Sequence, residues 1–229
     1  CELIVPSKYF ESQSTLLYYR SKTGSREFLV EFEPRGIAMF PYSAYILNDE
    51  FYIFGRIQQS NYRIDDYLLI TDSFGLERKF MTFGQLDLDE RLFEIKLTED
   101  TTFIISSTIS TLDYYQPNKI EGWRRPWIYC LNKHGTVLWE WKGEENDTRT
   151  GAGGPFQKTQ DGGWMIVSND LKEVFNGFGT EIWAANTLAR FDSQFNLIWK
   201  DTLHEFAYYL NKIVDIKYDA NHDWYILVG

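Results

Sequence analysis

The stretch EGWRRPW (residues 121–127) holds the side chains best suited to bind a partner or ligand. Two tryptophans flank two arginines and a proline, which combines large apolar surface with planar forks of hydrogen-bond donors. We expect Trp123, Arg124, Arg125 and Trp127 to contact a partner protein or a glycan, because tryptophan can also stack on sugar rings. The alternative is structural: Trp127 begins a strand, Trp123 packs under a loop, and the arginines pair with nearby acidic loops.

Other residues that could carry chemistry lack the spacing for it. Asp87, Asp89 and Glu90 in LDLDE (residues 86–90) could offer oxygen atoms to calcium, but the stretch matches no EF-hand loop and is expected to be a solvated charge run. The three histidines lie at no metal-ligand spacing, and the motif G-x-S-x-G is absent. We therefore predict no catalytic residue, no metal site and no cofactor.

Composition excludes two further classes of function. The chain has 229 residues with 33 acidic and 23 basic side chains, a net charge of −10 that disfavours a nucleic-acid partner. Its apolar runs are only a few residues long, too short to cross a membrane as a helix. The hydrophobic content of 44%, with 17% aromatic, is ample for a packed core and favours strands.

Tryptophan spacing reveals an internal repeat. Three pairs lie sixty residues apart: Trp123 with Trp183, Trp139 with Trp199, and Trp164 with Trp224. Chance would give about 0.2 such pairs for a chain of this composition. The turn residues Asp72, Asn132 and Asp192 share the spacing. A glycine lies three residues after Asp72 and after Asn132, but Phe195 stands at that position after Asp192, so the third turn is expected to close differently.

Each copy of the repeat predicts four short strands separated by turn residues. The predicted strands are residues 44–48, 51–57, 66–71 and 76–82 in the first copy, 92–97, 101–107, 127–132 and 136–141 in the second, and 154–159, 164–169, 186–192 and 196–201 in the third. Residues 15–32 resemble the last two strands of a further copy, and residues 211–229 resemble the first two.

The patterns Asn132-x-x-Gly135-x-x-x-Trp139 and D-G-G-W (Asp161 to Trp164) resemble the PQQ-like and WD40-like β-propeller repeats in the broad sense. The resemblance implies an all-β propeller of four-stranded blades, about four in number, with one blade shared by both chain ends. The alternative is a fragment of a larger propeller. In either case we expect the turn motif to be a structural turn between the outer strands, and Trp139 to be a residue of the core.

The propeller resemblance also implies where a site would lie. The connections within blades (108–126 and 170–185) and between blades (83–91 and 142–153) should cluster on one face. Long loops on a rigid scaffold are where binding residues concentrate.

The two cysteines have different expected roles. Cys130 lies in the apolar run WIYCLN and is expected to be a small buried hydrophobe, with a disulfide to Cys1 as the alternative. A chain that begins with Cys resembles a mature bacterial lipoprotein, which implies lipid attachment at Cys1, a tether over residues 1–14 and a propeller domain over residues 15–229. The alternative is a chain boundary that happens to fall on cysteine.

Two functions follow as expectations. The first is a non-enzymatic lipoprotein of the bacterial cell envelope, a scaffold that binds a membrane protein as an accessory subunit of an outer-membrane assembly. Only Glu2 is acidic in the first eight residues, which favours the periplasmic leaflet over the cell surface. The second is a propeller that binds or hydrolyses carbohydrate on the same loop face, with tryptophans as stacking platforms and carboxylates as acid and base.

Overall fold

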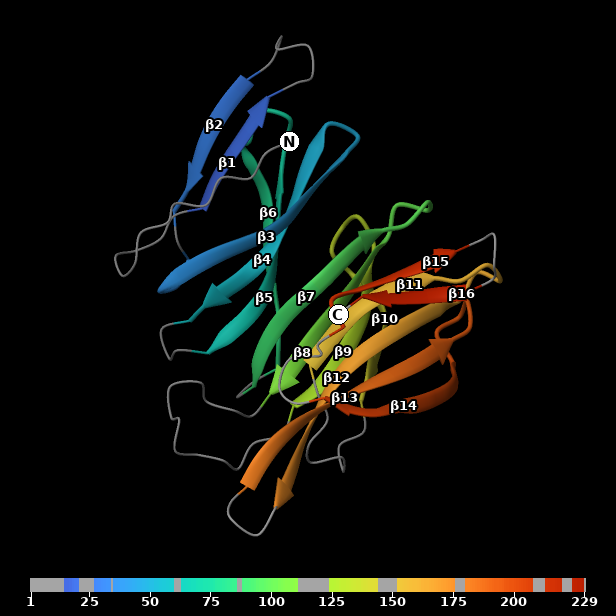
Figure 1. The fold of residues 1–229 in the computed structure, drawn as a ribbon. Coiled ribbons are helices and arrows are strands. Elements are labelled where there is room, and N and C mark those ends of the chain that lie inside the picture. Colours follow the sequence, from blue (N-terminus) through green and yellow to red (C-terminus); the bar gives the residue numbers. More distant parts are fainter. Residues whose placement is uncertain are drawn as a thin grey trace.

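The computed structural model shows an all-β protein of five antiparallel sheets arranged one after another along the chain (Figure 1). It describes residues 15–20, 27–33, 35–59, 63–85, 88–110, 124–143, 152–175, 180–207, 213–219 and 224–228. We number the sheets I to V in chain order. Three have four strands in sequence order, and the first and last have two. Four-stranded sheets built from consecutive antiparallel strands confirm the predicted repeat.

The strand bounds follow the sequence prediction closely. Sheet I contains β1 (Thr15–Arg20) and β2 (Glu27–Phe32). Sheet II contains β3 (Ala38–Leu47), β4 (Glu50–Gln58), β5 (Ile64–Thr71) and β6 (Glu77–Phe83). Sheet III contains β7 (Asp89–Leu97), β8 (Phe103–Ser110), β9 (Arg124–Leu131) and β10 (Val137–Lys142). Sheet IV contains β11 (Ala152–Lys158), β12 (Trp164–Phe175), β13 (Thr180–Phe191) and β14 (Leu197–Ala207). Sheet V contains β15 (Asp215–Asp219) and β16 (Trp224–Val228).

The sheets stack face to face, so the middle strands bury both of their sides. In β4, Phe51 and Ile53 pack with sheet I residues, whereas Tyr52 and Phe54 pack with sheet III residues. Successive side chains of a strand point to opposite faces of its sheet, so a strand between two sheets must be apolar on both. This requirement explains the near-continuous apolar runs of the sequence, such as FYIF and YLLI.

Four core clusters join the five sheets in series. The cluster between sheets II and III is the largest and centres on Phe103, which contacts the rings of Tyr45, Tyr52 and Phe54. The cluster between sheets III and IV includes Phe156 and Phe191. Each cluster therefore depends on two neighbouring sheets rather than on one.

The turn motif is a structural turn between two strands, as predicted. The side-chain oxygen Oδ1 of Asp72 accepts hydrogen bonds from the backbone N–H groups of the residues two and four positions later, and Asn132 and Asp192 do the same at 2.8–3.0 Å. This is an Asx turn, in which a side-chain oxygen replaces a backbone acceptor. It ends the third strand of each complete sheet and begins the fourth.

The prediction that the third turn closes differently is wrong. Phe195 adopts a φ of +61°, close to the +82° of Gly75 and the +76° of Gly135. Its N–H donates to the carbonyl of Asp192 at 3.1 Å, as the N–H of Gly75 donates to Asp72 at 3.0 Å. The Phe195 ring stacks on Trp139 with the ring centroids 3.3 Å apart, and this contact offsets the strain of a left-handed backbone.

The repeat also includes β-bulges, which could not be predicted from the sequence. The fourth strand of each complete sheet has a β-bulge, at Arg78, Leu138 and Ile198 respectively, and these positions are sixty residues apart. A bulge adds one residue and increases the local twist. Its recurrence at a fixed spacing shows that the copies share backbone geometry as well as residue pattern.

Two predictions about connections are wrong. Residues 170–185 were expected to be a loop excursion, but β12 and β13 continue through this segment as a long hairpin, with the register running from Trp164 opposite Phe191 to Phe175 opposite Thr180. The terminal hairpins were expected to form one shared sheet. Within the described residues, β1 pairs only with β2, and β16 pairs only with β15, at different ends of the molecule in Figure 1.

Two smaller predictions are confirmed. Trp139 packs against the cluster between sheets III and IV, and Cys130 is a free, buried thiol in the same cluster, with an exposed fraction of 3%. The described part of the chain contains no helix long and apolar enough to cross a membrane.

The Phe195 turn provides a test of backbone strain. Phe195→Ala and Phe195→Gly both remove the stacked ring, but only glycine adopts the left-handed conformation freely, so the glycine variant should be more stable by about 1 kcal/mol. Urea denaturation of both variants measures this difference. Gly75→Ala is the matched control and should cost a similar amount; equal stability of the two Phe195 variants would show that the turn carries no strain.

Candidate functional site

The structure separates the residues of EGWRRPW. Arg124 and Arg125 begin β9, and Trp127 follows two residues later; only the backbone of Arg124 is described, and Trp123 lies outside the described residues, as does Cys1. Arg125 is half-buried. The described ends of two of the connections predicted to share a face, 108–126 and 142–153, lie together, since the N–H of Gly143 donates to the carbonyl of Pro126 at 2.9 Å. We call this the loop end.

Trp127 is a core residue at the loop end. Its exposed fraction is 5%, its ring stacks on Tyr129 with the centroids 4.3 Å apart, and its Nε1 donates to Oε2 of Glu140 at 2.9 Å. Trp127 thus lies where the structural interpretation of the motif expects it. The binding role of Trp123, Arg124, Arg125 and Trp127 stays a prediction.

A group of buried carboxylates lies beneath the loop end. Asp66 of β5 accepts hydrogen bonds from the backbone N–H of Leu92 at 2.7 Å, from Ser107 Oγ at 2.5 Å and from the Tyr129 hydroxyl at 3.3 Å. The three donors come from three strands of sheet III, whereas Asp66 belongs to sheet II. One carboxylate therefore ties two sheets together.

The LDLDE stretch is not a solvated charge run where it is described. Asp89 is 9% exposed and Glu90 is fully buried, because β7 begins at Asp89 and carries both side chains into the space between sheets II and III. Oδ1 of Asp89 accepts from the backbone N–H of Ile64 at 3.0 Å, and Oε1 of Glu90 accepts from the N–H of Gln85 at 2.7 Å. Asp87 lies outside the described residues. A cation–carboxylate pair, Arg63 Nε with Asp65 Oδ1 at 2.9 Å, completes the group.

Burial changes the acidity of these groups. It raises the pKa of Asp66 to about 7, against the hydrogen bonds from Ser107 and Leu92 and the charge of Arg56, which lower it. Burial also raises the pKa of Glu90 to about 9, and the nearby charges of Asp65 and Asp66 add to the effect. Raised carboxyl pKa values are a feature of catalytic acids as well as of buried structural groups.

The hydrogen bonds favour the structural role for this group. Asp66 is enclosed by the backbone and hydroxyl groups it binds, so no oxygen of it faces a cleft. The same device ties sheets III and IV, where Oε2 of Glu94 accepts from the N–H of Phe156 at 2.8 Å and Thr108 accepts from Gly153 at 2.8 Å. Among the described residues, no three His, Cys, Asp or Glu side chains come together as a metal site.

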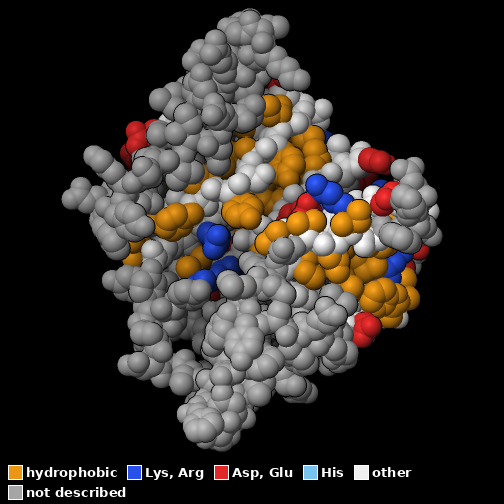
Figure 2. Space-filling view, viewed as in Figure 1, with side chains coloured by type: hydrophobic (Ala, Val, Ile, Leu, Met, Phe, Trp, Pro, Cys, Tyr) orange, Lys and Arg blue, Asp and Glu red, His pale blue; other side chains and the backbone are white. Residues whose placement is uncertain are grey.

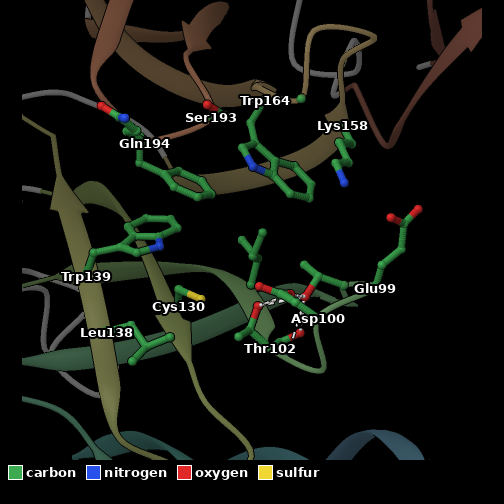
Figure 3. A pocket seen from close by; sticks show the side chains of 14 residues that line it. Glu99, Asp100, Thr102, Cys130, Leu138, Trp139, Lys158, Trp164, Ser193 and Gln194 are labelled. Atoms are coloured by element: carbon green, nitrogen blue, oxygen red, sulfur yellow. Dashed lines mark hydrogen bonds between the residues drawn. The ribbon is translucent and has the colours of Figure 1, made fainter.

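A cleft opens at the opposite end of the sheets, between sheets III and IV (Figure 3). Its volume is about 410 Å³. The turn before β8, the start of β10, the turn before β12 and the Asx turn before β14 surround it. We call it the turn-end cleft, and its lining includes Glu99, Asp100, Trp139, Lys158, Trp164 and Phe195.

Aromatic rings form one wall of the turn-end cleft. Phe195 stacks on Trp139 on one side and on Trp164 on the other, the latter at 5.8 Å between centroids with an interplanar angle of 16°. Figure 3 shows the two tryptophans pointing into the space, with Glu99 and Lys158 on the side away from Trp139. An apolar wall facing charged side chains is the usual composition of a ligand site.

Sequence reasoning identified the residues of the turn-end cleft but not the cleft. The sequence predicts core packing for Trp139 and a differently closed turn at Phe195, and it uses Trp164 only as a marker of the repeat; all three pack in the cluster between sheets III and IV. The signal that could have located the cleft is the replacement of the turn glycine by Phe195, because Trp139 lies beside the Asx turn of the next sheet. The expected site lay at the other end.

The buried Glu90 gives a test of the loop end by pH. Its pKa rises from an ordinary value of 4.5 to about 9, so the folded chain holds an extra proton between these pH values and the free energy of unfolding falls as pH rises through the window. Asp66 adds the same trend up to about pH 7. Glu90→Gln should flatten the profile and be most stabilising, relative to the parent, near pH 9.

The measurement is urea denaturation at several pH values from 5 to 9. Glu99→Gln, at an exposed turn, is the matched control and should leave the profile unchanged. A Glu90→Gln profile parallel to the parent would show that Glu90 does not hold this proton.

Comparison with known proteins gives no relative from which to assign a function. No known protein-family model matches the chain, and a search of the curated proteins finds no match.

Proposed function

We propose that this chain is a non-enzymatic binding protein of the bacterial cell envelope, built from propeller-type blades, anchored by a lipid on Cys1 and bound to a partner protein of an outer-membrane assembly. Four-stranded repeats, face-to-face stacking and recurrent Asx turns support propeller blades. The periplasmic leaflet is the location that the weakly acidic start of the chain favours.

The observation that carries this proposal is that carboxylates are buried between the sheets while apolar side chains are exposed on the surface. At the loop end, carboxylates such as Asp66 and Glu94 are used to lock neighbouring sheets, which makes a rigid platform. Apolar side chains meanwhile stay on the surface near the same end, for example Ile37, Phe40 and Tyr42 at the start of β3 with exposed fractions of 40–50%. Figure 2 shows hydrophobic side chains gathered on one face of the molecule. Extended exposed apolar surface is a feature of protein–protein contact.

The test is retention of a partner from detergent-solubilised membranes. Trp123→Ala with Arg124→Ala should release the partner while leaving the unfolding transition unchanged, because both residues belong to the segment predicted from the sequence to bind it. Phe74→Ala, at an exposed Asx turn of sheet II, is the control and should retain the partner. Unchanged retention by the double variant would contradict the proposal, as would a parent protein that captures nothing.

The turn-end cleft favours a second candidate, carbohydrate binding. The half-buried ring of Trp139, held by its stack on Phe195, offers apolar surface for sugar C–H groups, and Lys158 and Asp100 supply polar partners for hydroxyls. The cleft lies at the end opposite to the loop end, so this candidate and the first use different surfaces and can be tested separately.

The expected outcome for this candidate is a hit on a glycan array that Trp139→Ala lowers at least tenfold. Trp199→Ala is the matched control, since Trp199 is the repeat equivalent of Trp139 and does not line the cleft. Lys158→Met should weaken binding without affecting the stacked rings. A parent protein that binds no glycan, or a hit that Trp139→Ala leaves intact, would exclude the cleft as a sugar site.

A further inference from the structure

A second cleft, with a volume of about 410 Å³, opens between sheets I and II. Its lining includes β2 on the side of sheet I and the Asx turn at Gly75 on the side of sheet II. Figure 1 shows β2 beside the strands of sheet II. We call this space the sheet I–II cleft, and it shares no lining residue with the turn-end cleft.

The floor of the sheet I–II cleft is apolar. Phe32, Met39 and Leu69 line it, with exposed fractions of 8%, 2% and 1%. All three belong to the core cluster that joins sheets I and II, so the floor is fixed by the packing of both sheets. Leu76 adds an apolar side chain at the edge of the cleft, where it is 65% exposed. Such a floor can receive the apolar part of a ligand.

Charged side chains line the same cleft. They are Glu31, Glu33, Glu77 and Arg35. Three carboxylates against one guanidinium leave the lining with a negative balance. Because complementary charge selects the partner of a site, this balance favours a ligand that carries a positive charge and disfavours an anion.

Arg35 shows what kind of group the cleft can hold. Its guanidinium lies over the ring of Phe80, 4.4 Å from the centroid, and its Nη2 pairs with Oε1 of Glu77 at 2.5 Å. The Phe80 ring is in turn fixed by stacking on Tyr67, with the centroids 5.5 Å apart. An aromatic face beside a carboxylate attracts organic cations. We call the Phe80 ring and the Glu77 carboxylate the cation seat.

The cation seat belongs to sheet II alone among the three complete sheets. The register of the fourth strand gives the equivalent residues in sheets III and IV: Glu140 and Lys200 for Phe80, and Val137 and Leu197 for Glu77. Neither of these sheets has an aromatic ring and a carboxylate together at these two positions. The repeated fold therefore does not require the pair, which is consistent with a role in binding.

A ligand can compete with Arg35 for the cation seat. The Arg35 side chain is 46% exposed and that of Glu77 is 34% exposed. Exposed ion pairs and exposed cation–π contacts each stabilise a structure only slightly. A ligand cation would gain the same two contacts and would also bury its apolar part on the floor of the cleft.

We propose that the sheet I–II cleft binds an organic cation, an amine or guanidine attached to an aryl or alkyl body. The charged group replaces Arg35 in the cation seat, and the body lies against the apolar floor. This surface is separate from the loop end and from the turn-end cleft, so binding here is independent of both the partner protein and the carbohydrate candidate.

The experiment titrates the full chain with phenethylammonium and with hydrocinnamate, its matched anion, and follows the methionine methyl signals by NMR. The chain has three methionines. Met39 lines the sheet I–II cleft, whereas Met81 and Met165 do not and serve as internal controls. Phenethylammonium should move the Met39 signal alone, and hydrocinnamate should move none of the three.

Variants test the cation seat. Arg35→Ala should tighten phenethylammonium binding about fivefold, because it removes the competing guanidinium. Phe80→Leu and Glu77→Gln, each in the Arg35→Ala background, should weaken binding by a similar factor. Arg78→Ala is the matched control: Arg78 lies next to Glu77 but pairs with Asp72 outside the cleft, so the affinity should not change.

Three results would overturn the proposal. A Met39 signal that moves with hydrocinnamate and not with phenethylammonium would assign the cleft to an anion held by Arg35. Equal tightening by Arg78→Ala and Arg35→Ala would show that only the general negative charge of the surface attracts the probe. A Met39 signal that phenethylammonium leaves unmoved, in the parent and in Arg35→Ala alike, would exclude an organic cation from this cleft.

Discussion

Burial of both faces of a sheet is the constraint on which the rest of this structure depends. Sheets II, III and IV each have a neighbour on either side, so their middle strands have no solvent face and must be apolar at consecutive positions. The polar residues are displaced to the strand ends and turns. This displacement produces both candidate surfaces, the carboxylate-rich loop end and the turn-end cleft.

Two-sided burial also explains why the buried carboxylates are where they are. The first strands β7 and β11 each contain a bulge, between Leu92 and Glu94 and between Gly153 and Phe156. A bulge leaves a backbone N–H without a ladder partner, and burial between two sheets makes an unsatisfied donor costly. Asp66 accepts from Leu92 and Glu94 accepts from Phe156 at these bulges. The cost of burying the carboxylates is offset because they satisfy donors that would otherwise be orphaned.

The sequence predicted what local patterns determine and missed what neighbouring sheets determine. Strand positions, the Asx turns and the burial of Cys130 follow from residues within a few positions of one another. Glu90 appeared solvated because its neighbours in sequence are charged, but its surroundings are set by β5 of the preceding sheet. Phe195 could not be assigned a left-handed turn from the sequence, because the compensating ring, Trp139, is far away along the chain.

The sixty-residue period itself has a limit that only the structure reveals. Trp164 and Trp224 match in sequence, but Tyr225 and Leu227 of β16 occupy the positions of Trp164 and Ile166, since the hairpin of sheet V gains one residue. A one-residue slip turns a strand's two faces around, so a sequence match does not guarantee that equivalent side chains face the same way.

The placement of the turn-end cleft follows from the same stacking. Wherever one complete sheet follows another, the fourth strand of the first lies beside the Asx turn of the second, and the residue at that junction decides whether the gap is filled. Between sheets II and III, Met81 lies against Gly135 and fills it. Between sheets III and IV, Phe195 replaces the glycine, and its ring holds Trp139 and Trp164 apart as the wall of a cleft. The junctions differ at this turn residue and also in the facing fourth strand, where Trp139 and Trp141 stand in the places of Lys79 and Met81, and such differences give a repetitive scaffold a unique site.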